Sequence, residues 1–202
     1  MRSFRYLLHG ALAVALLALS GAVVVADDKD KKDEDEKPDV IFVPTPQEVV
    51  EAMLKLAKVT KDDTVYDLGC GDGRIVLSAA RIYKAKAEGF DVSSERLKEC
   101  KENLDKEKNK KEIEKLVKFH KKNIFKQDLK DATVVTLYLL TELNTKLVPQ
   151  LNKMKKGSRV VTQTFDIPDY QEDKKETVKT KEGTEYDIYL YTIPLKKKKN
   201  KD

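Results

Sequence analysis

Two patterns of apolar residues alternate along the chain between positions 46 and 164. Short, nearly continuous apolar runs predict β-strands, and segments with an apolar residue at every third or fourth position predict amphipathic helices. The predicted strands span 64–68, 86–91, 117–121, 132–140 and 159–164, and the predicted helices span 46–58, 74–83, 94–108 and 143–154. Strands that alternate with helices are typical of a parallel sheet covered by helices, so the pattern predicts an α/β fold.

The two ends of this pattern carry further signals. At the start, Thr45 precedes Pro46 and stands three residues before Glu48, which predicts a capping box with Thr45 as the N-cap of the first helix. At the end, residues 176–181 and 185–194 alternate in polarity around a turn that contains glycine, which predicts an antiparallel hairpin. A parallel sheet finished by such a hairpin is therefore expected.

The first 39 residues differ in composition from the rest. In residues 1–26, two arginines precede an apolar run, which predicts a secretory signal peptide cleaved before Asp27. Because the apolar run over 7–26 approaches the ~20 residues that cross a bilayer, an uncleaved membrane anchor is the alternative. Residues 27–39 have no apolar side chain to bury and predict a charged, disordered linker.

Length and charge allow one folded domain. Of the 202 residues, 40% are hydrophobic and 37% charged, which suits a single domain over 40–195 followed by a basic tail over 196–202. The 40 Lys and Arg against 35 Asp and Glu give a net charge of +5, with both signs interspersed. No strong field of one sign is implied, so a nucleic-acid partner is not expected. We expect a monomer.

A glycine-rich turn after the first predicted strand carries the candidate chemistry. The strand contains Asp67 near its end, and Gly69, Gly71 and Gly73 follow at alternate positions before the helix. Glycines let the backbone turn with positive φ and let a ligand lie against bare peptide, so all three are candidate cofactor-binding residues. An acid before the first glycine suits a cationic ligand better than a pyrophosphate. Asp91, about 20 positions after Gly71, is spaced to accept ribose hydroxyls; alternatively it caps the helix that follows.

The segment Asp67-Leu-Gly-Cys-Gly-Asp-Gly73 resembles motif I of the class I S-adenosylmethionine-dependent methyltransferases. The segments 43–50, 71–76, 138–144 and 159–166 resemble small bacterial methyltransferases related to the protein-lysine methyltransferases that modify the c-subunit of ATP synthase. This resemblance implies a Rossmann-like, seven-stranded sheet whose last strand inserts antiparallel. It also implies S-adenosyl-L-methionine as the cofactor.

The same resemblance implies roles for single residues. Asp67, Gly69 and Gly71 would hold the methionine end of S-adenosylmethionine, and Asp91 would hold its ribose. Asn123 stands where many methyltransferases place an aspartate for the adenine amine. An Asn carbonyl can also accept that hydrogen bond, so Asn123 is a further candidate cofactor-binding residue.

Tyr138 is the candidate catalytic residue, because it stands near the end of the fourth predicted strand, where such folds place groups that face the substrate. Its alternative role is that of an aromatic residue at the edge of the core. Glu142, Asn144, Asp166 and Tyr170 are its candidate neighbours. The first two are otherwise residues of a helix start, and Asp166 is otherwise a turn residue.

Other kinds of site are not indicated. His9 and His120 are isolated, and no His, Cys, Asp or Glu cluster has metal-ligand spacing, so no metal site is predicted. The fourth strand lacks the Asp/Asn-Pro-Pro-Tyr/Phe sequence of enzymes that methylate base amines. Cys70 and Cys100 are expected to be small, buried thiols that face different elements and form no disulfide.

The sequence therefore favours an S-adenosylmethionine-dependent methyltransferase that acts on a protein lysine. A methyltransferase with a small-molecule acceptor is the second hypothesis, and an exported, non-catalytic module with the same fold is the third. An NAD-dependent oxidoreductase ranks last because the glycine spacing differs from the dinucleotide fingerprint. The leader implies a periplasmic or secreted protein, or one anchored in a membrane through residues 7–26 if the leader is not cleaved.

Overall fold

The computed structural model describes residues 42–199. The signal peptide predicted over 1–26, the linker predicted over 27–39 and the end of the basic tail at 200–202 lie outside the described residues. Within the described part of the chain, no helix is both long enough and apolar enough to cross a membrane.

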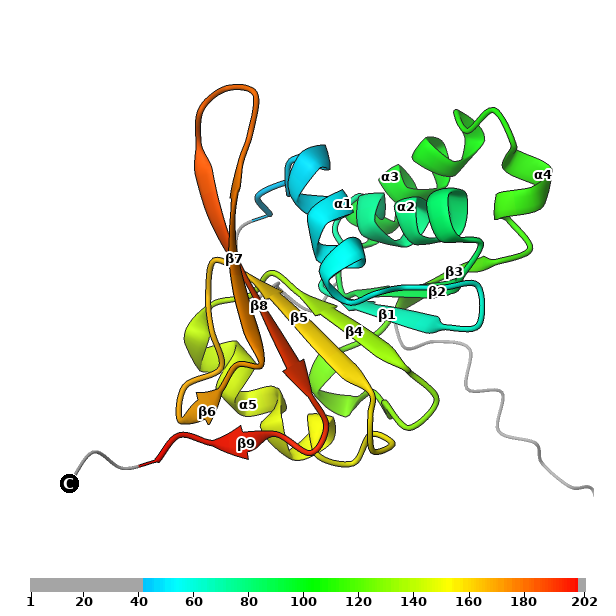
Figure 1. The fold of residues 1–202 in the computed structure, drawn as a ribbon. Coiled ribbons are helices and arrows are strands. Elements are labelled where there is room, and N and C mark those ends of the chain that lie inside the picture. Colours follow the sequence, from blue (N-terminus) through cyan, green and yellow to red (C-terminus); the bar gives the residue numbers. More distant parts are fainter. Residues whose placement is uncertain (1–41, 200–202) are drawn as a thin grey trace, which may run out of the picture. The chain divides into compact units, whose positions relative to one another are not determined.

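A seven-stranded sheet forms the centre of the domain (Figure 1). It consists of β1 (Thr64–Leu68), β2 (Lys86–Asp91), β3 (Val117–Lys121), β4 (Val134–Leu137), β5 (Arg159–Gln163), β7 (Lys174–Lys179) and β8 (Glu185–Thr192). The strand order is β3-β2-β1-β4-β5-β8-β7; β1 to β5 are parallel, and β8 lies antiparallel between β5 and β7. The predicted α/β fold is confirmed, as are its C-terminal hairpin and antiparallel strand.

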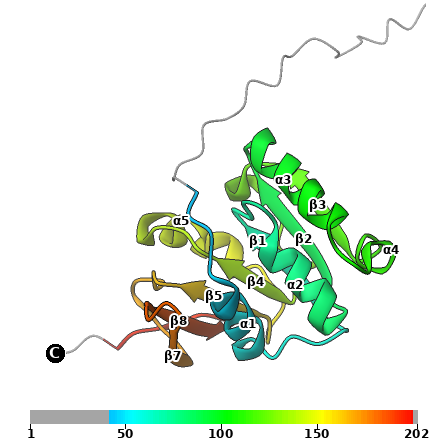
Figure 2. The same ribbon diagram turned by 90° about the horizontal axis from the view of Figure 1, so that it is seen from above.

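Helices cover both faces of this sheet (Figures 1 and 2). One face carries α1 (Gln47–Leu56), α2 (Arg74–Tyr83), α3 (Ser94–Asp105) and the short α4 (Lys110–Ile113). The opposite face carries α5 (Thr141–Leu151) and the 3-10 turn η1 (Ile124–Lys126). Each face therefore buries its own apolar cluster.

Alternation along the strands divides the apolar side chains between the two clusters. Val65 and Val134 pack in the cluster beneath α1 and α2, whereas the next residues, Tyr66 and Val135, pack in the cluster beneath α5. Consecutive strand residues point to opposite faces of a sheet. Asp67, two residues after Val65, therefore lies on the α2 side.

The first helix lacks the predicted capping box. α1 has Pro46 at its N-cap position, and no side chain caps it. The Thr45 hydroxyl instead donates to Gln163 Oε1 at 2.7 Å, and the Thr45 carbonyl accepts from Arg74 Nη1 at 2.7 Å. The prediction was wrong because contacts with β5 and α2 occupy the residue that a local pattern assigned to the helix end.

Several other boundaries differ from the sequence prediction. β4 stops at Leu137 instead of continuing to 140, and the residues that follow it line a cavity. α3 stops at Asp105, short of 108. Beyond the hairpin, β9 (Lys196–Lys197) pairs antiparallel with β6 (Tyr170–Gln171), so strand pairing reaches the first two residues of the segment expected to form the tail.

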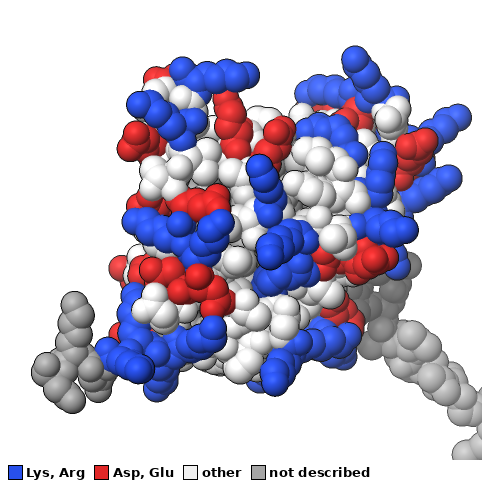
Figure 3. Space-filling view, in the orientation of Figure 1, with Lys and Arg blue, Asp and Glu red and all other residues white. Residues whose placement is uncertain are grey.

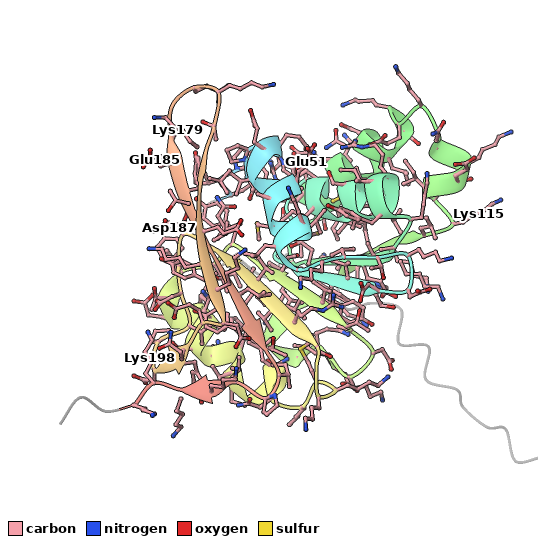
Figure 4. The ribbon with its side chains drawn as sticks, in the orientation of Figure 1. Glu51, Lys115, Lys179, Glu185, Asp187 and Lys198 are labelled. Carbon is pink, nitrogen blue, oxygen red and sulfur yellow. The ribbon has the colours of Figure 1, made fainter. Side chains whose placement is uncertain are left out.

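The β7–β8 hairpin extends past the carboxyl end of β5. Gln163, the last residue of β5, pairs with Ile188, so the first part of β8 and the turn lie beyond it. Charges of both signs are interspersed on the face shown in Figure 3. On the hairpin itself, Lys179 pairs with Glu185 at 3.8 Å (Figure 4). Exposed pairs of this kind contribute little to stability.

A buried carboxylate, Asp63, links the amino ends of three strands. It precedes β1 directly and is 7% exposed. Its oxygens accept hydrogen bonds from the Thr133 hydroxyl at 2.6 Å, from the Thr60 amide at 2.8 Å and from Arg159 Nη2. Burial alone would raise the pKa of Asp63, but these hydrogen bonds and the Arg159 charge outweigh burial and lower it. Asp63 is thus an anion shared by the starts of β1, β4 and β5.

Asp63→Asn should lower the free energy of unfolding by about 1.5–3 kcal/mol near pH 7, the contribution of hydrogen bonds to a charged group. Because the pKa of Asp63 is lowered by folding, its stabilisation is complete above the ordinary carboxyl pKa of ~3.9 and is lost as the pH falls through the folded-state value. Urea unfolding near pH 7 and near pH 3 measures this effect. A difference between wild type and variant that is equal at both pH values would contradict it.

Candidate active site

A cavity of about 1080 Å³ lies at the carboxyl edge of the parallel strands. α2 follows β1 on one face of the sheet and α5 follows β4 on the other, so the loops after these adjacent strands diverge and leave a crevice. Asp67, Gly69, Asp91, Asn123 and Tyr138 all line it. Most of the predicted site residues thus share one cavity.

Asp67 forms a buried, acidic part of this cavity. It is 3% exposed, and Thr136, its partner across the β1–β4 ladder, donates a hydrogen bond to Asp67 Oδ1 at 2.7 Å. Burial raises the pKa of Asp67 to about 7; the Thr136 hydroxyl opposes this rise, and the charges of Asp91 and Asp72 add to it. The carboxyl group is therefore partly protonated near neutrality, and a cation beside it would favour its ionised form.

The glycine loop holds Asp91 in place. Asp91 Oδ2 accepts from the Gly71 amide at 3.0 Å, and Oδ1 accepts from the Ser93 amide at 2.9 Å. A carboxylate offers about four acceptor sites, so both oxygens keep lone pairs for further donors such as paired hydroxyls. The side chain that caps α3 is that of Ser93, which accepts from the Arg96 amide.

The Phe42 ring covers the glycine loop. The position favours glycine for two reasons: a Cβ at Gly71 would overlap this ring, and Gly71 has a φ of +52°. The Arg96 guanidinium lies 4.7 Å from the centroid of the Phe42 ring. Phe42 and Val43 both line the cavity and are 38% and 55% exposed. The segment before α1 therefore forms a wall that the sequence analysis missed, because a single exposed aromatic residue makes no pattern.

Gly73 packs behind the loop. A Cβ there would lie 2.9 Å from Cys100 Sγ and 2.8 Å from the Phe119 ring, so Gly73 permits the close approach of α2 to α3 and β3. The Cys70 and Cys100 thiols are buried and free, as predicted. They were wrongly expected to be apart: both lie near the Gly71 carbonyl, at 4.0 and 3.0 Å, and the Cys100 thiol, together with burial, raises the pKa of Cys70. Sequence distance concealed this contact between the loop and α3.

Asn123 follows β3 and lies beside an aromatic ring. Its Oδ1 accepts from the Phe125 amide at 2.9 Å and so caps η1. Phe125 also lines the cavity, and Lys146 Nζ lies 3.8 Å from the centroid of its ring. An aromatic ring beside an amide oxygen offers a planar base a surface to stack on and an acceptor for its amine.

Tyr138 belongs to an aromatic and apolar part of the cavity. Its ring stacks with that of Phe165, with centroids 6.3 Å apart and planes at 23°. Burial raises the pKa of Tyr138, Tyr186 adds to the rise, and a hydrogen bond with Thr164 opposes it. The phenol is therefore neutral at physiological pH. Leu140, also in the lining, is 44% exposed, so this part of the cavity reaches the surface.

The residues predicted as neighbours of Tyr138 do not line the cavity. Asn144 is fully buried in α5 and donates to the carbonyls of Phe165 and Asp166, at 3.1 Å each. Glu142 lies in the first turn of α5, and Tyr170 belongs to β6. Asn144 therefore does not line the cavity itself but hydrogen-bonds the loop after β5, whose Phe165 lines it.

Asp72 and Arg74 line the cavity as well and were not predicted. Arg74 Nε and Nη2 donate to the Asp72 carboxylate at 2.9 and 2.6 Å, while Nη1 donates to the Thr45 carbonyl. The pair thus joins the glycine loop to the segment before α1. An acid two residues before an arginine at a helix start was the available signal.

Among residues 42–199, no group of three or more His, Cys, Asp or Glu side chains is arranged to hold a metal ion. His120 Nε2 lies 2.7 Å from Glu88 Oε2, across the β2–β3 pair.

Comparison with known proteins identifies relatives of the chain. The ANTKMT methyltransferase domain matches residues 67–174. A protein-lysine N-methyltransferase from Saccharolobus islandicus (strain REY15A) is 43% identical over 159 residues, which is 77% of this chain and 95% of that protein. A lysine N-methyltransferase of the ATP synthase c-subunit, from Caenorhabditis elegans, is 33% identical over 110 residues, which is 54% of this chain and 55% of that protein.

Solved structures of methyltransferases resemble the chain as well. An RNA methyltransferase from Salinibacter ruber, crystallised with S-adenosyl-L-homocysteine, is 39% identical with a TM-score of 0.65, over 79% of this chain and 98% of that one. A precorrin-6y C5,15-methyltransferase from Geobacter metallireducens shares the fold, at 18% identity and a TM-score of 0.58, over 79% of this chain and 95% of that one. The predicted enzyme class and cofactor are confirmed. The chain belongs to the ANTKMT methyltransferase family and is an S-adenosylmethionine-dependent methyltransferase.

Proposed function

We propose that this methyltransferase acts on the side-chain amine of a lysine in a protein. The observation that carries the proposal is a single cavity lined both by the buried acid Asp67 and by the aromatic and apolar side chains of Tyr138, Phe165 and Leu140. The acidic part suits a cationic cofactor, and the apolar part suits the hydrocarbon stem of a lysine. The Saccharolobus islandicus relative, named as a protein-lysine N-methyltransferase, supports this acceptor.

The groups along the cavity fit S-adenosylmethionine. When bound, the cofactor supplies a methyl group on a positively charged sulfonium, which is an excellent leaving group. We assign Asp67 to the ammonium of its methionine part, Asp91 to its ribose hydroxyls and Asn123 to its adenine amine, with Gly69 as bare peptide beside the methionine part. Gly71, predicted for the same role, lies under the Phe42 ring and does not line the cavity. The lone pairs that remain on Asp91 and the aromatic surface beside Asn123 support this assignment.

The acceptor amine must be deprotonated and oriented. The pKa of a free lysine amine is about 10.4, so only a small fraction is deprotonated at pH 7. Apolar walls at Phe165 and Leu140 disfavour the charged form and lower that pKa. The neutral Tyr138 phenol can accept a hydrogen bond from the amine and orient its lone pair. Orientation within a site contributes on the order of 7–11 kcal/mol to such reactions.

S-adenosylmethionine with a labelled methyl group should label lysine in a lysine-rich acceptor protein, faster as the pH rises from about 7 to about 9. The deprotonated fraction of lysine rises about tenfold per pH unit below its pKa of ~10.4. Tyr138→Phe should lower the rate roughly 100-fold, as loss of a positioned polar group does, without weakening the binding of S-adenosylhomocysteine. Mass spectrometry of the labelled peptides locates the methyl group.

Tyr83→Phe is the matched control, because Tyr83 ends α2 and does not line the cavity; its rate should equal that of the wild type. Label found only in small molecules of a lysate would favour a small-molecule acceptor. Label in added RNA would favour the acceptor named for the Salinibacter ruber relative. Tight binding of S-adenosylhomocysteine with no transfer at all would favour a non-catalytic module.

The affinity for S-adenosylhomocysteine, which keeps the ammonium, should rise with pH. Burial raises the pKa of Asp67 to about 7, so below this pH the group is protonated and offers the ammonium no charge. Affinity should fall up to about tenfold per pH unit below 7 and become constant above it. Calorimetric titration measures this profile, and Asp67→Asn should flatten it. A flat profile in the wild type would remove Asp67 from the cofactor site.

We also propose that the chain is exported and that residues 1–26 are removed. The arginines and apolar run of these residues, followed by the charged segment 27–39, support cleavage before Asp27. Mass spectrometry of the native protein should therefore find Asp27 at its N-terminus. Intact Met1 in a membrane fraction would favour an anchor, and intact Met1 in a soluble cytosolic fraction would exclude export.

A further inference from the structure

The turn after β5 holds its central residue, Thr164, in an unfavourable conformation. Thr164 has a φ of +63°, in the left-handed region that β-branched side chains rarely occupy. The Phe165 amide donates to the Gln163 carbonyl at 2.6 Å. The three residues thus form a γ-turn, of which the type with a positive central φ is rare and strained. Such strain persists only where surrounding contacts enforce it.

Contacts from two other elements enforce this turn. From β8, the Asp187 carbonyl accepts from the Thr164 amide at 2.7 Å; Figure 4 labels Asp187 on the hairpin. From α5, Asn144 Nδ2 donates to the carbonyls of the two residues after Thr164, at 3.1 Å each. Asn144 therefore acts as a clamp on the chain that leaves the turn.

Buried polar atoms without a protein partner occur in the residues before this turn and in its clamp. Among residues 42–199, the buried side-chain nitrogen and oxygen atoms that lack a hydrogen-bond partner are Asn144 Oδ1, Thr162 Oγ1 and Gln163 Nε2. Two of them belong to the end of β5, and the third belongs to the side chain that clamps the turn. Such atoms are unfavourable and few in folded proteins.

This turn positions the aromatic part of the cavity. Phe165 and Tyr138 both line the cavity, and their rings are stacked 6.3 Å apart. The Thr164 side chain lies near enough to the Tyr138 phenol to oppose the rise of its pKa. Since β4 and β5 are paired, the two aromatic residues follow the ends of adjacent strands. A change of backbone conformation at Thr164 would move Phe165 relative to Tyr138.

We propose that Thr164 is a positioning residue for methyl transfer, with Asn144 as the clamp that holds its turn. The strained turn fixes Phe165 relative to Tyr138 and thereby fixes the wall against which the acceptor amine lies. This inference rests on the proposed function, which assigns the acceptor to that wall. Thr164 acts through these two rings, and the strain is retained because a relaxed turn would leave the acceptor loosely oriented.

Thr164→Gly tests the proposal, because glycine adopts the same positive φ without strain and leaves the turn free to relax. We expect a melting temperature equal to or above that of the wild type and an affinity for S-adenosylhomocysteine within about twofold of it. The kcat with a lysine-bearing acceptor protein should fall roughly 10- to 100-fold, with a smaller change in KM. Amide hydrogen exchange over residues 164–167 should become faster.

Lys84→Gly is the matched control. Lys84 also has a positive φ, +57°, at the end of α2, and it does not line the cavity. This variant also places glycine at a positive φ, and it should keep the wild-type kcat and the wild-type exchange over 164–167. Asn144→Ala should reproduce the lower kcat and the faster exchange, with a lower melting temperature because its two hydrogen bonds are lost.

A Thr164→Gly enzyme with the kcat of the wild type would overturn the proposal, as would unchanged exchange over residues 164–167. If the wild type itself transfers no methyl group to lysine, the proposed function fails. The exchange measurement then still decides whether Asn144 holds the turn. Faster exchange over residues 164–167 in Thr164→Gly and in Asn144→Ala supports the clamp, and unchanged exchange overturns it.

Discussion

The domain depends on the parallel alignment of β1 with its two neighbours. In this register Asp67 lies opposite Gly89 of β2 and Thr136 of β4. Thr136 gives the buried carboxyl group a hydrogen bond, and Gly89 leaves room for the Cys70 side chain, which a Cβ there would meet at 2.8 Å. A shift of one residue would turn Asp67 to the other face of the sheet and remove it from the cavity. The pairing of β1 with β2 and β4 therefore fixes where the buried acid lies in the cavity.

The two edges of the sheet differ in how well their polar groups are satisfied. At the amino edge, Asp63 is ionised and bonded to Arg159 and to neighbouring hydroxyl and amide groups, so this network stabilises the fold. At the carboxyl edge, burial keeps Asp67 partly protonated, Thr164 is strained and Asn144 keeps an unpaired oxygen. Unfavourable groups are typical of functional sites that the rest of a fold must stabilise. The satisfied and the unfavourable groups thus lie at opposite ends of the same strands.

Local patterns predicted the elements, and contacts between distant residues decided the rest. The strands over 64–68, 86–91 and 117–121 have the bounds that their apolar runs predicted, and motif spacing brought most of the predicted site residues to one cavity. The errors arose where a partner lies far along the chain. Thr45 has the local pattern of a helix cap, yet its hydroxyl bonds Gln163, 118 positions away. The contact between the two thiols was missed for the same reason, and the ring over the glycine loop was missed because a single exposed aromatic residue makes no pattern.

The sheet has two open edges, β3 and β7. Both carry exposed lysines, among them Lys118 on β3 and Lys174, Lys175 and Lys179 on β7. An unpaired strand can add a strand from another molecule, and charged side chains along it, lysines above all, oppose this. The exposed lysines of β3 and β7 therefore disfavour edge-to-edge pairing between folded chains.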